Sequence, residues 1–285
     1  MTVIDAHHHL WDLTVRDQAW ITGPELAPIR RSFTLPDLEA ETRKAGVTAT
    51  VVVQTVTVPE ETPELLALAA DSDLIGAVVG WADLTSPGLA DELARLCSLH
   101  GGTFLSGIRH QVQGEPDPQW LTRPQVLRGL RAIADAGLVY DLVVLPHQLP
   151  AAIRAAETVP ELTFVLDHLG KPPIASGPAG LKPWAGHIRD LAALPNTVCK
   201  LSGMVTEADW ASWTVDGIRP YADTVIGAFG PRRLMFGSDW PVSTLAASYD
   251  DVVSATRALT AALTEAEQQE VWAGTAQRVY GIGRS

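Results

Sequence analysis

The sequence of 285 residues predicts an α/β protein, a (β/α)8 (TIM) barrel formed by one domain over residues 1–285. Eight short apolar runs recur at fairly even spacing, amphipathic helical patterns lie between them, and polar residues follow the ends of several runs. Continuous apolar runs are typical of strands that are covered on both faces, as in a parallel sheet. An open doubly wound sheet is the alternative, but no G-x-G-x-x-G follows the first run.

The elements follow in order along the chain. Strands are expected at residues 2–9, 49–55, 74–84, 105–110, 139–145, 162–170, 197–203 and 233–240, with helices at residues 34–46, 86–102, 123–137 and 247–263. The first helix has Thr34 as a candidate N-cap, Pro36 in its first turn and Gly46 as its stop. Residues 264–281 are expected to form a closing helix rather than a further domain.

Composition and charge exclude several classes of protein. The formal net charge is −12, which disfavours a nucleic-acid or anionic-membrane partner. Neither a signal-peptide pattern nor an apolar stretch of membrane-spanning length is present, so we expect a cytoplasmic protein. Cys97 and Cys199 form no disulfide framework or zinc knuckle, and we expect both as core or near-core thiols in a reducing compartment.

Three connections are long for a compact domain and rich in Trp, Pro and Gly. They cover residues 11–33, 111–123 and 170–184, and each follows an expected strand. Loops that follow barrel strands lie at the face where barrel active sites form. We expect these loops to set specificity, with residues such as Trp20, Arg30, Trp120 and Trp184 within reach of a substrate.

The first expected strand ends in three histidines, in the stretch MTVIDAHHHLWD. Residues i and i+2 of a strand share a face, so His7 and His9 point the same way and His8 points the other way. Two adjacent imidazoles can bind Zn²⁺ or another divalent ion. An H-x-H pair satisfied by loop carbonyls is the structural alternative, and the position at a strand end favours a functional role.

Other strand ends supply further polar side chains, namely Arg109 and His110, His147, Asp167 and His168, and Asp239. Polar residues at five or more strand ends of an apolar barrel indicate an active site. Individual residues have structural alternatives. Asp167 is adjacent to His168 and is expected to bond loop amides, and His147 follows a proline and could cap the next helix. Lys200 either pairs with a core carboxylate or reaches the barrel mouth as a substrate-binding cation. Trp81 either packs or stacks on a sugar ring.

The motifs DAHHHLWD, GIRH, DHLGKP, CKLSG and FGSDWP, in this order and spacing, resemble the amidohydrolase superfamily. More narrowly, they resemble its amidohydrolase 2 branch of sugar-lactone hydrolases, over nearly the whole chain. The resemblance implies a distorted barrel that opens an L-fucono-, L-rhamnono- or galactonolactone. It implies catalytic roles for Asp239 as general base and for His168, His7 and His9.

The resemblance also implies substrate contacts by Arg109 and by a strand-five histidine, which matches His147. His110, Lys200 and Trp81 complete the expected substrate-binding set. His7, His9 and Asp239 would hold one divalent ion, Zn²⁺ or Mn²⁺. A bridged binuclear centre is not expected, because strand four ends in Arg109 and His110 rather than in a bridging Lys or Glu. Catalysis without metal stays open.

The hypothesis is therefore a lactonase whose Asp239 activates water, with a small-molecule lactone as its partner and a homo-oligomer compatible with the sequence. One alternative is a metal-dependent decarboxylase or hydratase of an aromatic acid from the same superfamily. A second is a TatD-like metal-dependent nuclease, which would want a basic surface that the net charge of −12 opposes. A binding protein without activity would not need Asp239 beside an imidazole cluster.

Overall fold

The computed structural model describes residues 2–283 and contains one eight-stranded parallel sheet in the order β1 to β8. The strands are β1 (Ile4–His8), β2 (Ala49–Val53), β3 (Ile75–Gly80), β4 (Leu105–His110), β5 (Val139–Leu142), β6 (Phe164–Leu166), β7 (Thr197–Leu201) and β8 (Leu234–Phe236). The first and last strands meet through a parallel bridge between His8 and Trp240, with a 2.8 Å bond from the Asp239 amide to the His7 carbonyl. The sheet is thus a nearly closed barrel, which confirms the expected (β/α)8 fold.

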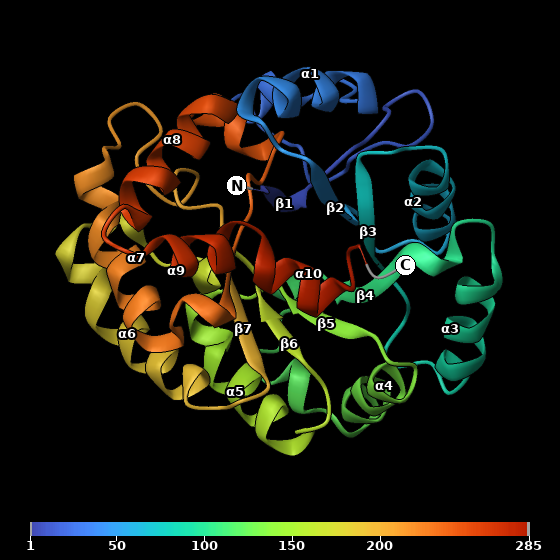
Figure 1. Ribbon diagram of the computed structural model, residues 1–285. Coiled ribbons are helices and arrows are strands. Elements are labelled where there is room, and N and C mark those ends of the chain that lie inside the picture. The colour runs from blue at the N-terminus through green and yellow to red at the C-terminus, as the bar shows by residue number, and fades with distance from the viewer. Residues whose placement is uncertain (1, 284–285) are drawn as a thin grey trace.

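Helices surround the strands, as Figure 1 shows. They are α1 (Leu35–Ala45), α2 (Glu61–Ala70), α3 (Leu89–Ser98), α4 (Pro124–Asp135), α5 (Leu149–Thr158), α6 (Pro178–Ala192), α7 (Val215–Phe229) and α8 (Tyr249–Thr260). The predicted start of α1 is confirmed, because the Thr34 amide donates to the Asp37 carboxylate (2.8 Å) in a capping box. Gly46 ends this helix with a φ of 72°. No helix within residues 2–283 is long and apolar enough to cross a membrane.

The core has two parts. The larger part lies between the barrel and the helices and includes residues from every helix from α1 to α8. The smaller part fills the barrel interior with Met235 and with small and β-branched side chains, which are Ile4, Ala6, Val51, Val53, Ala77, Val79, Val139, Val165 and Val198. Alternate residues of each strand therefore face inward, as expected for a packed barrel rather than a pore.

The C-terminal segment closes one end of the barrel (Figure 1). It consists of α9 (Glu265–Gln269), a π-helical turn (Glu270–Gly274) and α10 (Thr275–Tyr280), which follow one another without a break, so the expected closing helix is present with a π turn in its middle. Ala273, Ala276 and Tyr280 join the interior cluster. One of these side chains comes from the π turn and two come from α10, so both parts of the segment pack into the barrel interior.

The two cysteines differ in burial. Cys199 on β7 is buried, as expected, and burial raises the pKa of its thiol. Cys97 near the end of α3 is exposed, so the prediction that both are core or near-core thiols is wrong for Cys97. The helix presents Leu89, Leu93 and Leu96 to the core, and Cys97 falls outside this stripe.

Candidate active site

A register irregularity in β1 turns two histidines toward the barrel mouth. Ile4 and Ala6 face the barrel interior, so strict alternation would send His7 to the outside. The pairing of β1 with β2 shifts between Asp5 and His8, and His7 faces inward instead. His8 faces outward, with Nε2 3.0 Å from Thr50 Oγ1. His7 and His9 thus share a face, as predicted, because an irregular strand re-aims its side chains.

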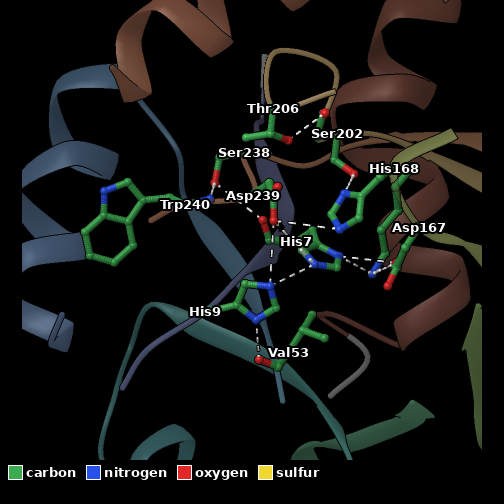
Figure 2. A network of polar contacts seen from close by, with 12 residues as sticks. His7, His9, Val53, Asp167, His168, Ser202, Thr206, Ser238, Asp239 and Trp240 are labelled. Carbon is green, nitrogen blue, oxygen red and sulfur yellow. Dashed lines mark hydrogen bonds and ion pairs between the residues drawn. The ribbon is translucent and has the colours of Figure 1, made fainter. Parts of the chain in front are cut away.

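Three imidazoles converge on Asp239 in Figure 2. The Asp239 carboxylate oxygen Oδ1 lies 3.9 Å from His7 Nε2, 3.7 Å from His9 Nε2 and 3.7 Å from His168 Nε2. These side chains come from the ends of β1, β6 and β8, and all are at least 90% buried. The structure thus brings together the four residues expected to be catalytic.

Each imidazole is fixed by a partner at its other ring nitrogen. Nδ1 of His9 donates to the Val53 carbonyl (2.7 Å), which leaves its Nε2 with a free lone pair. His168 Nδ1 contacts Ser202 Oγ at 2.9 Å, and His7 Nδ1 lies 3.2 Å from Asp167. Burial lowers the pKa of His168 to about 4 and that of His7 well below its usual value. Both rings are therefore neutral at pH 7.

Asp239 occupies a constrained position after β8. Its φ is 57°, a left-handed conformation that is costly for a residue with a side chain. Its amide bonds the His7 carbonyl, and the following Trp240 packs on Phe33 with ring centroids 5.3 Å apart, away from the histidines (Figure 2). Burial acts to raise the pKa of Asp239, but His168, His9 and Lys171 outweigh it, so the pKa lies below the ordinary value. Asp239 is a charged carboxylate at neutral pH.

A buried layer of charged residues lies behind the histidines. Lys200 on β7 is fully buried, with Nζ 2.5 Å from Asp141 and 3.0 Å from Asp167. Asp167 also accepts from Arg109 Nη1 (2.9 Å). Burial acts to raise the pKa of Asp167, but Lys200, His7 and Arg109 together hold it well below its usual value.

This layer corrects two expectations. Asp167 bonds charged side chains and not loop amides, because its side chain points into the barrel rather than toward the loop. Lys200 pairs with core carboxylates, the first of its two expected arrangements, and its full burial keeps it out of the cavity as a substrate contact.

Three residues expected to contact substrate lie elsewhere. His147 is exposed in the turn before α5 and does not line the cavity. His110 and Trp81 contact each other instead, through a bond from Trp81 Nε1 to His110 Nδ1 (3.1 Å). His110 also stacks on Trp120, with ring centroids 4.3 Å apart. The last residue of β4 faces outward, so His110 cannot join Arg109 at the mouth.

A cavity of about 680 Å³ opens onto Asp239, His9, His168 and Arg109. All three long loops contribute to its lining, through residues that include Trp20, Gln113 and Lys171. Of the other loop residues expected near a substrate, Trp120 and Trp184 are buried and Arg30 does not line the cavity. Sequence reasoning missed the loop after β7, which supplies Thr206, Glu207 and Trp210.

Two glycines of the sequence motifs were also missed as parts of the site. A Cβ at Gly203, in CKLSG, would lie 2.7 Å from His168 Nδ1, and Gly203 has a φ of 64°. A Cβ at Gly237, in FGSDWP, would lie 2.8 Å from the His7 Cβ. The glycines of these two motifs therefore leave space for the imidazoles of His168 and His7. Their presence in the motifs is the signal in the sequence that could have pointed to this role.

The donor set fits one divalent ion. Within residues 2–283, the groups able to hold a metal are His7, His9 and Asp239, and His7, Asp167 and His168. The Nε2 atoms of His7 and His9 lie 3.2 Å apart, close to the separation of about 3.3 Å that tetrahedral zinc imposes on two imidazoles. The Nε2 atoms of His7 and His9 face each other, and a divalent ion between them would be bound by both nitrogens. Arg109 Nη1 supplies one cationic contact, 3.3 Å from His7 Nε2.

The fold defines a barrel enzyme, and its candidate active site is built from histidine and aspartate at the carboxyl ends of the strands. The chain belongs to the amidohydrolase family, whose model, described as Amidohydrolase, matches residues 4–282. The family expected from the sequence motifs is therefore confirmed.

Two curated relatives and one solved structure are similar over most of the chain. An L-fucono-1,5-lactonase of Burkholderia multivorans is 40% identical over 98% of this chain and 96% of its own. A second L-fucono-1,5-lactonase, of Burkholderia ambifaria, is 40% identical over 87% of this chain and 83% of its own. A Burkholderia multivorans amidohydrolase crystallised with bound zinc aligns with a TM-score of 0.93 and 39% identity over 99% of this chain and 100% of its own.

Proposed function

We propose that this protein hydrolyses a sugar-acid lactone to the open-chain acid, with Asp239 as the general base. The observation that carries the proposal is the charged Asp239 carboxylate, which faces a cavity beside the imidazoles of His7, His9 and His168. The similarity to two L-fucono-1,5-lactonases supports a lactone as the substrate. A carboxylate held in its charged form is suited to accept a proton from water.

In the proposed reaction, Asp239 takes a proton from a water molecule, and the hydroxide oxygen forms a bond to the lactone carbonyl carbon. The bond from that carbon to the ring oxygen then breaks. Asp239 returns its proton to the ring oxygen, which becomes the hydroxyl group of the product. One water is consumed, and the carboxylate ends in its starting state.

The negative charge that develops on the carbonyl oxygen needs stabilisation. Arg109 lines the cavity, and its guanidinium is held by Asp167 and by the Gln54 carbonyl, so its positive charge is fixed beside the histidines. A divalent ion held by His7, His9 and Asp239 would polarise the carbonyl group.

The first test is hydrolysis of a panel of aldonolactones by the purified protein, followed with a pH indicator before and after chelation. Turnover that survives chelation identifies a reaction in which the protein side chains suffice. Turnover that is lost and then restored by Zn²⁺ or Mn²⁺ identifies a working metal site. Hydrolysis of no lactone in either state would refute the proposal and favour the aromatic-acid decarboxylase.

The role of Asp239 has its own test in Asp239→Asn. The amide cannot accept the proton, so kcat on the best lactone should fall roughly a hundredfold or more. Asp223→Asn, an exposed position on α7, is the control and should keep wild-type turnover. Near-wild-type kcat in a folded Asp239→Asn protein would remove Asp239 as the base.

A further inference from the structure

One wall of the cavity is a continuous row of polar side chains, which we call the hydroxyl wall. It comprises Gln111, Gln113, Lys171 and Glu207, all of which line the cavity. Gln113 Nε2 donates to Gln111 Oε1 (3.2 Å), and Lys171 Nζ donates to Gln113 Oε1 (3.1 Å). Lys171 Nζ also lies 3.2 Å from Glu207 Oε1. The row therefore ends in an ion pair that faces the cavity.

The inner end of the hydroxyl wall is connected to the buried layer of charged residues that lies behind the histidines. Gln111 Nε2 donates to Gln54 Oε1 (3.0 Å), the same oxygen that accepts from Arg109 Nη2 (3.1 Å). Gln54 is fully buried and cannot rotate freely. The positions of Gln111, Gln113 and Lys171 are thus fixed relative to the reacting centre, which is what discrimination between similar ring substituents requires.

The ion pair retains hydrogen-bonding capacity. Lys171 Nζ has three protons, of which Gln113 and Glu207 take two. No residue in the range 2–283 donates a hydrogen bond to Glu207 Oε2. Lys171 and Glu207 are 24% and 22% exposed, so both remain accessible from the cavity. One ammonium proton and one carboxylate oxygen are therefore available side by side.

This arrangement matches a pair of neighbouring hydroxyl groups. A hydroxyl both donates and accepts, so one can donate to the carboxylate while its neighbour accepts from the ammonium. Much of the remaining lining is apolar, from Trp20, Leu26, Val56, Val58, Trp210 and Val242. Apolar side chains can pack against the ring carbons, but they cannot form hydrogen bonds with hydroxyl groups. A lactone without hydroxyl groups would displace water from the ion pair without replacing the hydrogen bonds of that water. Discrimination against such a lactone should therefore be strong.

We propose that Lys171 and Glu207 are specificity-determining residues that bind two adjacent hydroxyl groups of a polyhydroxylated lactone. This inference rests on the proposed lactonase activity. It assigns the hydroxyl wall to substrate choice and leaves bond cleavage to Asp239. Loss of the Lys171 or Glu207 side chain should therefore raise KM for hydroxylated lactones. It should also lower the ratio of their kcat/KM to that of an unsubstituted lactone.

The experiment compares the aldonolactone that wild type hydrolyses fastest with δ-valerolactone, an unsubstituted lactone, in Glu207→Gln and Lys171→Met. We expect KM for the aldonolactone to rise about tenfold or more in each variant, with a smaller change in kcat. The ratio of kcat/KM for the aldonolactone to that for δ-valerolactone should fall by a similar factor. Glu207→Gln preserves the side-chain shape, so it decides the question if Lys171→Met does not fold.

The matched control is Glu41→Gln, which removes the same kind of pair on the surface of α1, where Lys44 Nζ lies 3.2 Å from Glu41 Oε1. This variant should keep the wild-type ratio. A folded Glu207→Gln protein with unchanged KM, or with equal losses on both lactones, would overturn the specificity assignment alone. A wild-type protein that hydrolyses neither lactone would instead overturn the lactonase proposal on which the assignment rests.

Discussion

Asp239 remains charged in a buried place because groups from the segments that follow β1 and β6 offset the loss of water around it. His168, His9 and Lys171 lower its pKa and act against burial. The same burial lowers the pKa of His168 to about 4 and keeps His7 neutral. Both kinds of shift lower a pKa, which keeps the Asp239 carboxylate charged and the imidazoles of His7 and His168 neutral. These three side chains therefore keep the same charge states over the physiological pH range.

This reasoning predicts the acid side of the pH profile. In the proposed reaction Asp239 acts as a deprotonated base, and its lowered pKa keeps it deprotonated well below pH 7. His168 becomes protonated only near pH 4. The value of kcat/KM should therefore be nearly constant from pH 7 to about pH 5 and fall below that. Initial rates of lactone hydrolysis, corrected for the spontaneous reaction at each pH, measure this directly. An acid limb with a midpoint near 6.5 would contradict it and indicate an ordinary histidine.

At the scale of elements, the C-terminal segment connects the closed end of the barrel to the active site. The Tyr280 hydroxyl at the end of α10 donates to Asp141 on β5, with distances of 3.1 and 2.9 Å to its two oxygens. Asp141 pairs with Lys200 on β7, and Lys200 Nζ lies 3.0 Å from His7 Nδ1. Burial raises the pKa of Asp141 to about 6, and Lys200 acts against it. Residues of α10, β5 and β7 thus form a connected series of polar contacts that ends at the imidazole of His7.

Tyr280→Phe tests this connection. Loss of the hydroxyl removes a bond to a buried carboxylate, which should lower the free energy of unfolding by about 2 kcal/mol. It should also lower kcat by about tenfold, because partners behind a reactive imidazole fix its orientation. Tyr221→Phe is the matched control, since its hydroxyl bonds only the backbone carbonyls of Gly177 and Pro173. Equal kcat values in the two variants, with the stability loss in both, would limit Tyr280 to a structural role.

At the scale of elements, too, the limits of sequence reasoning become clear. The H-x-H pair and Asp239 were identified because each stands at a strand end. The apolar runs also placed all eight strands. His147 and His110 stand at strand ends as well, but one lies in a solvent-exposed turn and the other faces outward. Lys200 was ambiguous, because its partners Asp141 and Asp167 come from other strands. The direction in which a side chain points, and its pairing with residues of other strands, depend on the register of the strands. A single sequence does not reveal that register.

The whole molecule depends on contacts between residues near its two ends. Asp5 on β1 accepts from the Ser238 amide (2.8 Å), Ser238 Oγ (2.6 Å) and Tyr249 on α8 (2.9 Å). It also accepts from the His7 amide (3.1 Å). Burial raises the pKa of Asp5, and these four donors act against that rise. The carboxylate thus joins β1, the turn after β8 and α8 where the barrel closes.

Asp5→Asn is therefore predicted to loosen the whole barrel. The amide nitrogen cannot accept, so at least one buried donor loses its partner, and the free energy of unfolding should fall by about 2–3 kcal/mol. Denaturant unfolding of Asp5→Asn beside Asp223→Asn, an exposed aspartate on α7, measures the difference. A midpoint equal to that of the control would show that the closure does not depend on this carboxylate.

The closed end of the barrel also sets an order of events during translation. Chains are made from the N-terminus, and domains fold as units while synthesis proceeds. His7 and His9 are made before the residues that support them, because Asp239 comes with the turn after β8 and Tyr280 with α10. A nascent chain that stalls after β7 would carry Lys200 and Asp141 without Tyr280, and an interior without Ala273 and Ala276. The cluster of His7, His9, His168 and Asp239 can therefore be complete only after the turn that follows β8 has been made.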